Sequence, residues 1–504
     1  MKKLLFFLIS FFGISSILYA QSIDDALSSK KMKKDLDVFK NIRLKANSGL
    51  YKYRTKAEID SIYQWAFNEI EKSKTYRDFY NITSKLTDFE GSVHNSNSFS
   101  EKMKKSIKQE KSGYFPLPIK LVDGKIIINI ENEKIPLGAE IISINNIKIN
   151  EIIADIYKYY ETDGVNISGK FIGINYHFSK YYRYHFGLVD SFDVTYNIHN
   201  SNVVEKTNIK SVGNEEYYNN VKKRYSKPFD DSNYKEWKEN EKYSYKNIDT
   251  KTSILTINSF AIGENEKSPE HLKFVRFLDS AFIAIKTQNI KNLILDIRYN
   301  GGGNDPNELV IYEYLTQRNF SENKSAWVSF QKIPFLKYVE TKVPIFLRPL
   351  GVIKYNKYFK KEFPDEIDGK FYQNATSEDH KIRTPNKNAF NGNVYLLISP
   401  RVASAGSNFG SLVASNKNTT IIGEETMGGY YGHNGHTPMS YILPKSKILV
   451  TFSVVNLEQD VLKKENQKYD RGIIPDYEIT QNYEDFINNT DTQMNFTMKL
   501  IQKK

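Results

Sequence analysis

Apolar residues recur every three or four positions in the first part of the chain. The pattern is clearest in one run: Ile59, Ile62, Trp65, Ala66 and Ile70. This spacing is typical of a helix that buries one face. It predicts a helical N-terminal domain over residues 21–110, with His94 on its final loop.

The pattern changes to strands over residues 111–212. Ile126–Ile130 is a short apolar run, and apolar residues alternate with polar ones from Phe192 to Ile198. Alternation with a period of two indicates strands with one buried face. We therefore expect a β-rich second domain, followed by a polar linker over residues 213–247.

Strands and helices alternate from residue 248 to residue 482. Ile254–Ile257 and Leu293–Ile297 have the pattern of buried strands, and Leu272–Thr287 between them has a helical period. This alternation predicts an α/β domain. Within it, residues 324–391 are rich in Lys, Tyr and Pro, and we expect an insertion that forms a lid or a substrate rim.

The two ends of the chain lie outside these domains. We expect residues 483–504 to form a C-terminal tail. Residues 1–20 combine a basic start, a short apolar run and small residues before Gln21, which is typical of a cleavable secretory signal. The apolar run is short for a membrane span, so an uncleaved anchor is the less favoured alternative. The protein is therefore expected to be exported, to the periplasm or outside the cell.

Composition limits the function further. The 504 residues include no cysteine, which excludes disulfides and lipid attachment to a cysteine. The formal net charge is +12 at pH 7, but the lysines are spread along the chain with acids between them. Without a basic stripe or a nucleic-acid motif, a nucleic-acid partner is not expected. The positive charge suits acidic peptides or an association with an anionic cell envelope better.

Ser404 is the strongest chemical candidate in the chain. A buried strand pattern over Val394–Ser399 is followed by Pro400 and by small residues that can begin a helix at Ala405. A serine at such a strand-to-helix turn exposes its hydroxyl, and the unpaired N–H groups of the helix start can hold an oxyanion. The alternative is an ordinary serine that caps a helix.

Two glycine-rich segments supply further parts of such a site. Asn292–Arg298 has the pattern of a buried strand and leads into Gly301–Gly303, and Thr420–Ile422 leads into a loop with Gly428 and Gly429. Glycines after a strand let the backbone approach a ligand, and their N–H groups can point towards it. Each segment alone is equally compatible with a tight turn.

Taken in order, three segments resemble the C-terminal-processing and tricorn-type serine peptidase family. Asp296–Gly303 is similar to the family's D-L-R-x-N-x-G-G strand and loop, Ala403–Ser407 to its T/A-S-A-x-E nucleophile turn, and Gly423–Gly429 to its G-E-x-T-x-G loop. Ser407 stands where the family has glutamate. The resemblance implies a serine-type peptidase without a cofactor, built on an α/β catalytic core of the ClpP/crotonase-like kind.

The resemblance assigns roles to several residues. Ser404 would attack the scissile carbonyl, and the N–H groups of Ala405 and Gly302 would form the oxyanion hole. The substrate contacts would come from the two glycine loops: Gly301, Gly303, Gly428, Gly429 and Tyr430. Loss of one oxyanion donor typically slows such a reaction about 100- to 1000-fold.

The serine also needs a general base. In the family's tail-specific subgroup the base is a lysine just after the G-E-x-T-x-G loop, but Gly429 occupies that position here. Lys445 and Lys447 lie further on and fit solvated surface residues better. The tricorn-like subgroup uses a histidine near the start of the chain, and Leu86–His94 resembles its L-x-D-x-H segment with a short insertion. His94 is therefore the predicted base, since histidine titrates near neutral pH.

Two other histidines compete with His94. His433 and His436 follow the second glycine loop and border the same predicted site. A pair at this spacing is also compatible with a metal ion, but no third ligand is evident, so no metal is expected. An acid that orients the base is sought near the chain end, where Tyr469–Asp476 resembles the family's E-x-x-G-V-x-P-D element. Asp470 is its closest carboxylate, one residue out of register.

The second predicted domain has a resemblance of its own. Ile135–Ile149 is similar to the G-D-x-I-x-x-I-N-G segment of PDZ-like domains. PDZ domains bind the C-terminal end of a peptide by adding it to a sheet edge as a further strand. The carboxylate-binding loop is not recognisable, so a domain that only covers the catalytic cleft is the open alternative.

These features predict an exported serine peptidase that cleaves peptides or C-terminal regions of proteins. It would work through an acyl-enzyme on Ser404, with His94 as general base, and its partner would be a peptide or an unfolded protein. The alternative is a non-catalytic protein on the same scaffold that binds peptides or a hydrophobic ligand. The missing lysine and the imperfect match at Asp470 motivate it. The sequence leaves the cleavage specificity and the oligomeric state open.

Overall fold

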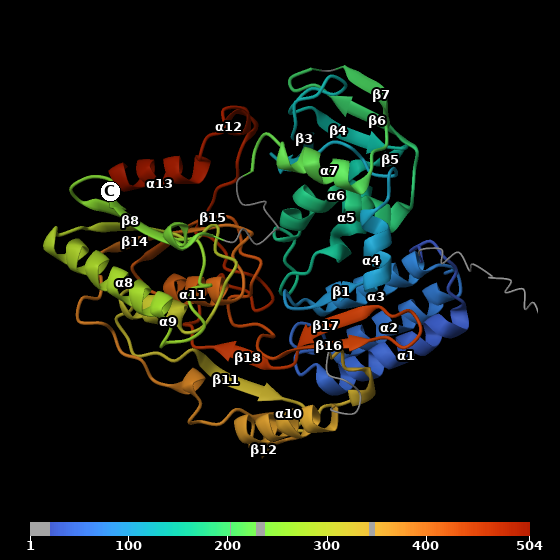
Figure 1. Ribbon diagram of the computed structural model, residues 1–504. Coiled ribbons are helices and arrows are strands. Elements are labelled where there is room, and N and C mark those ends of the chain that lie inside the picture. The colour runs from blue at the N-terminus through green and yellow to red at the C-terminus, as the bar shows by residue number, and fades with distance from the viewer. Residues whose placement is uncertain (1–20, 202, 228–236, 342–347, 504) are drawn as a thin grey trace, which may run out of the picture.

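The computed structural model describes residues 21–201, 203–227, 237–341 and 348–503. The predicted signal sequence, residues 1–20, lies outside this part of the chain. Figure 1 shows a helical N-terminal region next to a β-rich region, with an α/β region beside them. Among the described helices, none has the length and apolar character needed to cross a membrane.

The N-terminal part is helical, as the apolar spacing predicts. Its elements are α1 (Ser29–Ala46), α2 (Lys56–Ile70), α3 (Tyr76–Glu90), the short strand β1 (Ser96–Ser98) and α4 (Glu101–Lys108). The starts of α2 and α3 are set by capping boxes, in which Thr55 with Glu58 and Thr75 with Asp78 exchange side-chain-to-backbone hydrogen bonds. The sequence therefore encodes both the buried faces of these helices and the points where two of them begin.

The β-rich part contains an antiparallel sheet with strand order β2-β3-β4-β6-β7. Its strands are β2 (Ile119–Val122), β3 (Lys125–Ile128), β4 (Glu140–Ile144), β6 (Ser191–Asn197) and β7 (Val204–Lys210), with β5 (Ile147–Lys148) paired to β4. Its helices are α5 (Ile149–Ile156), α6 (Lys170–Phe186) and α7 (Asn214–Lys222). The strands predicted from Ile126 and from Phe192 thus occur as β3 and β6, and α6 contacts the edge strand β2.

A six-stranded sheet with strand order β19-β15-β14-β10-β9-β8 forms the centre of the α/β part. Its strands are β8 (Tyr243–Asn247), β9 (Thr252–Ile257), β10 (Asn292–Asp296), β14 (Asn393–Ile398), β15 (Thr419–Gly423) and β19 (Tyr477–Glu478). All neighbours are parallel except the edge strand β8, which runs antiparallel to β9. The predicted α/β core is confirmed, and β8 extends its sheet into the segment predicted as a linker.

Both faces of this sheet are covered, which explains its uninterrupted apolar strands. The covering helices are α8 (Pro269–Thr287), α9 (Asn307–Glu313) and α11 (Ala405–Ala414) on one face and α13 (Thr492–Lys503) on the other (Figure 1). Leu293 and Leu295 of β10 pack towards the first group, and Ile294 between them packs towards α13. Residues 483–504, predicted as a tail, form α12 (Tyr483–Ile487) and α13, so part of this tail belongs to the core.

The structure also has two smaller sheets, the first of which joins the N-terminal part to the α/β part. The first has strand order β1-β17-β16, with β16 (Pro438–Ile442) and β17 (Leu449–Ser453), and the second has order β12-β13-β11-β18, with β11 (Asn323–Val328), β12 (Asp365–Ile367), β13 (Lys370–Tyr372) and β18 (Asn456–Gln459). In the first sheet, Ser96 of the N-terminal part lies opposite Thr451 of the α/β part. The predicted insertion, residues 324–391, contributes most of β11, all of β12 and β13, and α10 (Arg348–Glu362).

Arg298 connects the end of β10 to the start of α13. Its guanidinium donates hydrogen bonds of 2.7 to 2.9 Å to both carboxylate oxygens of Asp296 and to both of Asp491. Arg298 is only 4% exposed, and a buried charge is tolerated only when it is paired. The Asp-x-Arg part of the strand motif therefore has a structural reason in this fold.

Replacing Arg298 by alanine is expected to lower the free energy of unfolding by about 3–5 kcal/mol, because Asp296 would stay buried without its partner. Urea denaturation followed by circular dichroism measures the change. Arg276→Ala on the exposed side of α8 is the control and should change stability by less than about 0.5 kcal/mol. Equal stability of the two variants would contradict the structural role of Arg298.

Candidate active site

Ser404 lies at the turn between β14 and α11. Its backbone angles are φ 52° and ψ −133°, which are unfavourable for a residue with a side chain. Such strain is typically retained where it serves function. Ser404 also precedes the first turn of α11, at the positive end of that helix, and the N–H of Ala405 has no acceptor among the described residues. The turn thus has the features of a nucleophile site.

Close packing beneath the turn holds its shape. The Ser399 hydroxyl donates to the Arg298 carbonyl at 2.5 Å and accepts from the N–H of Arg401 at 3.1 Å. Gly406 leaves no room for a side chain, because a Cβ there would lie 2.3 Å from the carbonyl oxygen of Asn300. The Ser404 turn and the segment before the first glycine loop are therefore in direct contact.

His94 reaches Ser404 from the N-terminal part of the chain. Its Nε2 lies 3.3 Å from the Ser404 Oγ. The pairing of β1 with β17 brings it there, since β1 begins two residues after His94. This separation is close to the range of 2.6–3.2 Å expected between a base and its proton donor, which often tightens when substrate binds.

The surroundings keep His94 neutral. Burial lowers the pKa of its imidazole to about 4, an effect that the backbone of Asn434 opposes and the charge of His436 reinforces. A neutral imidazole at pH 7 is the form that can accept the proton of a serine hydroxyl.

His433 supports His94 instead of competing with it. The two rings are stacked, with centroids 5.0 Å apart and planes inclined by 29°. Burial, with a smaller contribution from the charge of His94, lowers the pKa of His433 well below its usual range. The lysines considered as bases, Lys445 and Lys447, lie in the turn between β16 and β17, where Asp35 of α1 accepts the Lys445 N–H at 2.9 Å.

Asp163 links the loop of His94 to the second glycine loop, and no motif marks it in the sequence. Its carboxylate accepts hydrogen bonds from the N–H of Val93 at 2.9 Å and from the N–H of Gly429 at 2.8 Å. Burial raises the pKa of Asp163 to about 6, against the opposite effect of these two donors. An Asp-Gly pair at this point is a turn signal, but nothing local reveals which loops it joins.

Asp470 reaches the same junction through its backbone. Its carbonyl accepts the N–H of Val165 at 3.0 Å, and its carboxylate makes no hydrogen bond with His94 in the described part of the chain. The next side chain, Arg471, faces the second glycine loop, where its Nε donates to Glu425 at 2.7 Å. The structure therefore does not bring the predicted orienting carboxylate to the base.

The first glycine loop lies against Ser404. A Cβ on Gly302 would come within 2.8 Å of the Ser404 Cβ, and Gly302 has a φ of 107° that favours glycine. The N–H of Gly302 donates to Asn300 Oδ1 at 2.9 Å, so the predicted oxyanion donor already has an acceptor. The N–H groups of Gly301 and Gly303 have none among the described residues.

The second glycine loop packs against the Ser404 turn. A Cβ on Gly428 would lie 2.1 Å from the hydroxyl of Ser407, whose Oγ donates to the Ser404 carbonyl at 2.8 Å. Tyr430 is fully buried and donates to the Leu462 carbonyl at 2.8 Å. The loop turns inwards after its glycines, so the Tyr430 side chain packs in the core. This differs from the predicted role of Tyr430 as a substrate contact.

Comparisons with known proteins are consistent with this geometry. Residues 251–479 match the model of peptidase family S41. A search among curated proteins gave no match. Mature CPAF aligns with a TM-score of 0.56 at 12% identity, over 91% of this chain and 94% of its own. Mature CPAF complexed with lactacystin aligns with a TM-score of 0.56 at 12% identity, over 94% of this chain and 99% of its own.

The tricorn protease aligns with a TM-score of 0.35 at 14% identity, over 93% of this chain and 36% of its own. The two CPAF structures share the fold. The region matched by the family model contains the central strands from β9 to β19, the Ser404 turn and both glycine loops. The chain therefore contains a serine peptidase domain of family S41 over residues 251–479.

Proposed function

We propose that Ser404 and His94 form the catalytic pair of this peptidase. The observation that carries the proposal is the 3.3 Å separation between His94 Nε2 and Ser404 Oγ at a strained turn before a helix. His94 accepts the hydroxyl proton while Oγ attacks the scissile carbonyl, and it then gives that proton to the leaving amine. A water molecule, activated in the same way, hydrolyses the acyl-enzyme.

The oxyanion of this reaction is held by the N–H of Ala405 and by one N–H of the first glycine loop. Gly301 is the member of that loop with the most room beside its backbone, because a Cβ built there meets no atom within 4 Å. Gly302 takes part only if its N–H leaves the side chain of Asn300. Fixed donors of this kind stabilise the developing charge without reorganising.

The substrate is a peptide or a protein, and we place its C-terminal end beside the β-rich part. A cavity of about 520 Å³ is lined by residues of the edge strand β2, Lys120–Val122, and by Phe171 and Asn175 of α6. PDZ domains bind peptide ends along an edge strand, and here the peptide would displace the Asn175 side chain, which accepts the Leu121 N–H at 3.3 Å. Tyr299 and Pro400, which precede the first glycine loop and the Ser404 turn, line the same cavity.

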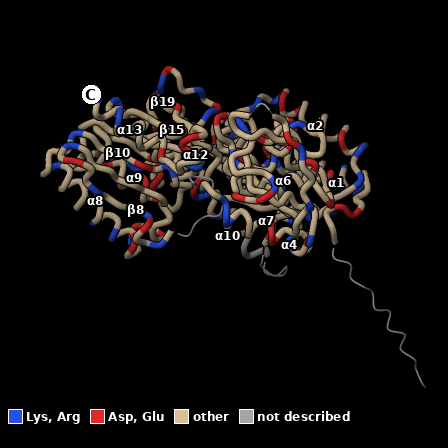
Figure 2. Tube along the Cα trace, turned by 90° about the horizontal axis from the view of Figure 1, so that it is seen from above, with Lys and Arg blue, Asp and Glu red and all other residues tan. Residues whose placement is uncertain are grey.

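Export to the periplasm or the cell exterior is part of the proposal. The basic start and short apolar run of residues 1–20 support it, and N-terminal sequencing of the exported protein should find Gln21 first. The net charge of +12 supports an association with an anionic envelope. Figure 2 shows Lys and Arg mixed with Asp and Glu over the described trace, so this attraction is diffuse.

Labelling with a fluorophosphonate probe tests the catalytic pair. Ser404→Ala should abolish labelling, and His94→Ala should slow it by about 10²- to 10⁴-fold, the usual contribution of a general base. In-gel fluorescence against time gives the rates. Ser280→Ala and His199→Ala, at exposed positions, are the controls and should label like wild type.

Two outcomes would contradict this assignment. Unchanged labelling of the Ser404→Ala variant would exclude Ser404, and unchanged labelling of the His94→Ala variant would require another base. A wild-type protein that binds the probe reversibly but is never labelled would favour the non-catalytic peptide-binding alternative.

His94 is expected to titrate near pH 4 in the folded protein, because burial disfavours the imidazolium. The folded pKa lies below the ordinary value of 6.5, so the unfolded chain takes up the proton first on acidification. Stability therefore falls as the pH drops from about 6.5 towards 4. NMR of carbon-13 histidine, with the His94 signal identified by its loss in His94→Gln, measures the midpoint. A midpoint near 6.5 would show that the ring is solvated.

Asp163→Ala should lower kcat by about 100-fold with a smaller effect on KM, because small displacements of a catalytic group have costs of this size. Asp163→Asn keeps one acceptor oxygen and should lose less. Peptide hydrolysis kinetics measure both, with the exposed Asp190→Ala as control. A change in KM alone would show that Asp163 does not position His94.

A further inference from the structure

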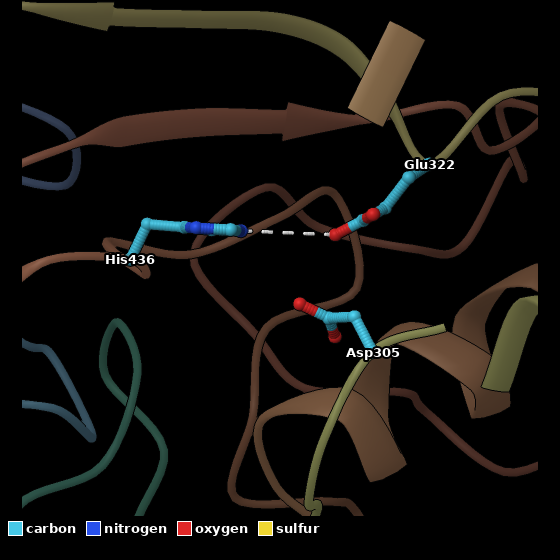
Figure 3. Close-up of side chains that lie close together, drawn as sticks. All are labelled: Asp305, Glu322 and His436. Carbon is cyan, nitrogen blue, oxygen red and sulfur yellow. Dashed lines mark ion pairs between the residues drawn. The ribbon is translucent and has the colours of Figure 1, made fainter. Parts of the chain in front are cut away.

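Three side chains outside the catalytic pair converge beside it. Asp305 lies just after the first glycine loop, Glu322 lies just before β11, and His436 lies between β15 and β16. Figure 3 shows the three side chains directed towards a common point. One donor atom from each lies within 4.8 Å of the other two. Segments far apart in the sequence thus bring two carboxylates and an imidazole together.

The spacing within this cluster is that of ligands around an ion. His436 Nε2 lies 3.8 Å from Glu322 Oε1, which is longer than a hydrogen bond (Figure 3). Two ligands bonded to one metal ion at roughly 2.0–2.2 Å stand about this far apart. Glu322 is 5% exposed, His436 is 33% exposed and Asp305 is exposed, so the cluster opens to solvent at Asp305 and His436.

A buried carboxylate behind the cluster lacks a partner. Glu308 of α9 is fully buried, and both of its carboxylate oxygens have no hydrogen-bond donor among the described residues. It interacts electrostatically with Asp305 and Glu322, so it faces the cluster. Asp379 adds further negative charge near Glu322 and His436. Burying a carboxylate without a cation is costly, so Glu308 is either protonated, in line with the rise in its pKa on burial, or balanced by additional positive charge.

We propose that Asp305, Glu322 and His436 bind a divalent transition-metal ion. Glu308 lies behind them, where it orients these ligands and adds negative charge. Mixed carboxylate and imidazole ligands suit Zn²⁺ best and Mn²⁺ next. Ca²⁺ and Mg²⁺ prefer oxygen ligands throughout, so His436 selects against them. All three residues lie within the region matched by the family model, and none of them belongs to the predicted catalytic pair.

The position of the site gives the ion a structural role. Asp305 follows Gly301–Gly303, and His436 lies three residues after His433, whose ring stacks on His94. An ion shared by these segments links the oxyanion loop to the loop that backs the general base. The effect of the ion on labelling of Ser404 rests on the proposed function, whereas the binding of the ion does not.

Isothermal titration of the chelator-treated mature protein tests the site. Zn²⁺ should bind with one ion per chain, and Glu322→Gln and His436→Ala should each weaken its Kd by at least about 10- to 100-fold, the loss found even for groups that only support a ligand. Glu308→Gln should weaken the Kd for Zn²⁺ by a factor within the same range. Glu366→Gln and His199→Ala are matched controls at exposed positions and should bind like wild type.

The outcomes separate this proposal from the catalytic one. Ser404→Ala should bind Zn²⁺ like wild type, so binding and labelling fail independently. The proposal is overturned if neither Zn²⁺ nor Mn²⁺ binds, or if binding survives in both Glu322→Gln and His436→Ala. A cluster neutralised only by protonated His436 would give the first of these results, with circular dichroism showing that the protein remains folded.

Discussion

The contact between Ser404 and His94 depends on docking two parts of the chain that are 310 residues apart. Among the described residues, the following interactions help to hold the docked state. Strand β1 pairs with β17, Asp35 of α1 accepts the N–H groups of Lys445 and Ser446, and Asp163 joins the His94 loop to the second glycine loop. Each is a directional hydrogen-bond contact, so the interface fixes position as well as proximity.

The same docking determines the chemistry of the base. His94 is desolvated at the interface, and its pKa falls to about 4 because burial disfavours the charged ring. A histidine on a loop of the isolated N-terminal part would be solvated and would titrate near neutrality. Geometry and protonation state therefore arise together, and a loosened interface would change both the distance to Ser404 and the readiness of His94 to accept a proton.

The elements that the sequence predicts well are those set by neighbouring residues. Local patterns predict the buried strand before Ser404, the glycine loops and the helix after Ser404. A motif identifies His94. Asp163 could not be inferred, because its two partners lie in loops distant from it in sequence. Asp470 and Tyr430 show a second limit of sequence patterns. A motif locates their segments, but tertiary packing decides which group of each residue faces the site. Asp470 makes its contact through its backbone carbonyl, and the Tyr430 side chain is buried.

The segment between β15 and β16 explains how distant groups can act on the base. It is held near its start, where Gly429 donates to Asp163, and near its end, where His436 faces Glu322 and Asp305. His433 lies between these two points and stacks on His94. Because both ends are restrained, we expect a change at either one to shift the middle of the loop and, through the ring contact, to displace His94. A cation at the far end would thus restrain the base without touching the substrate.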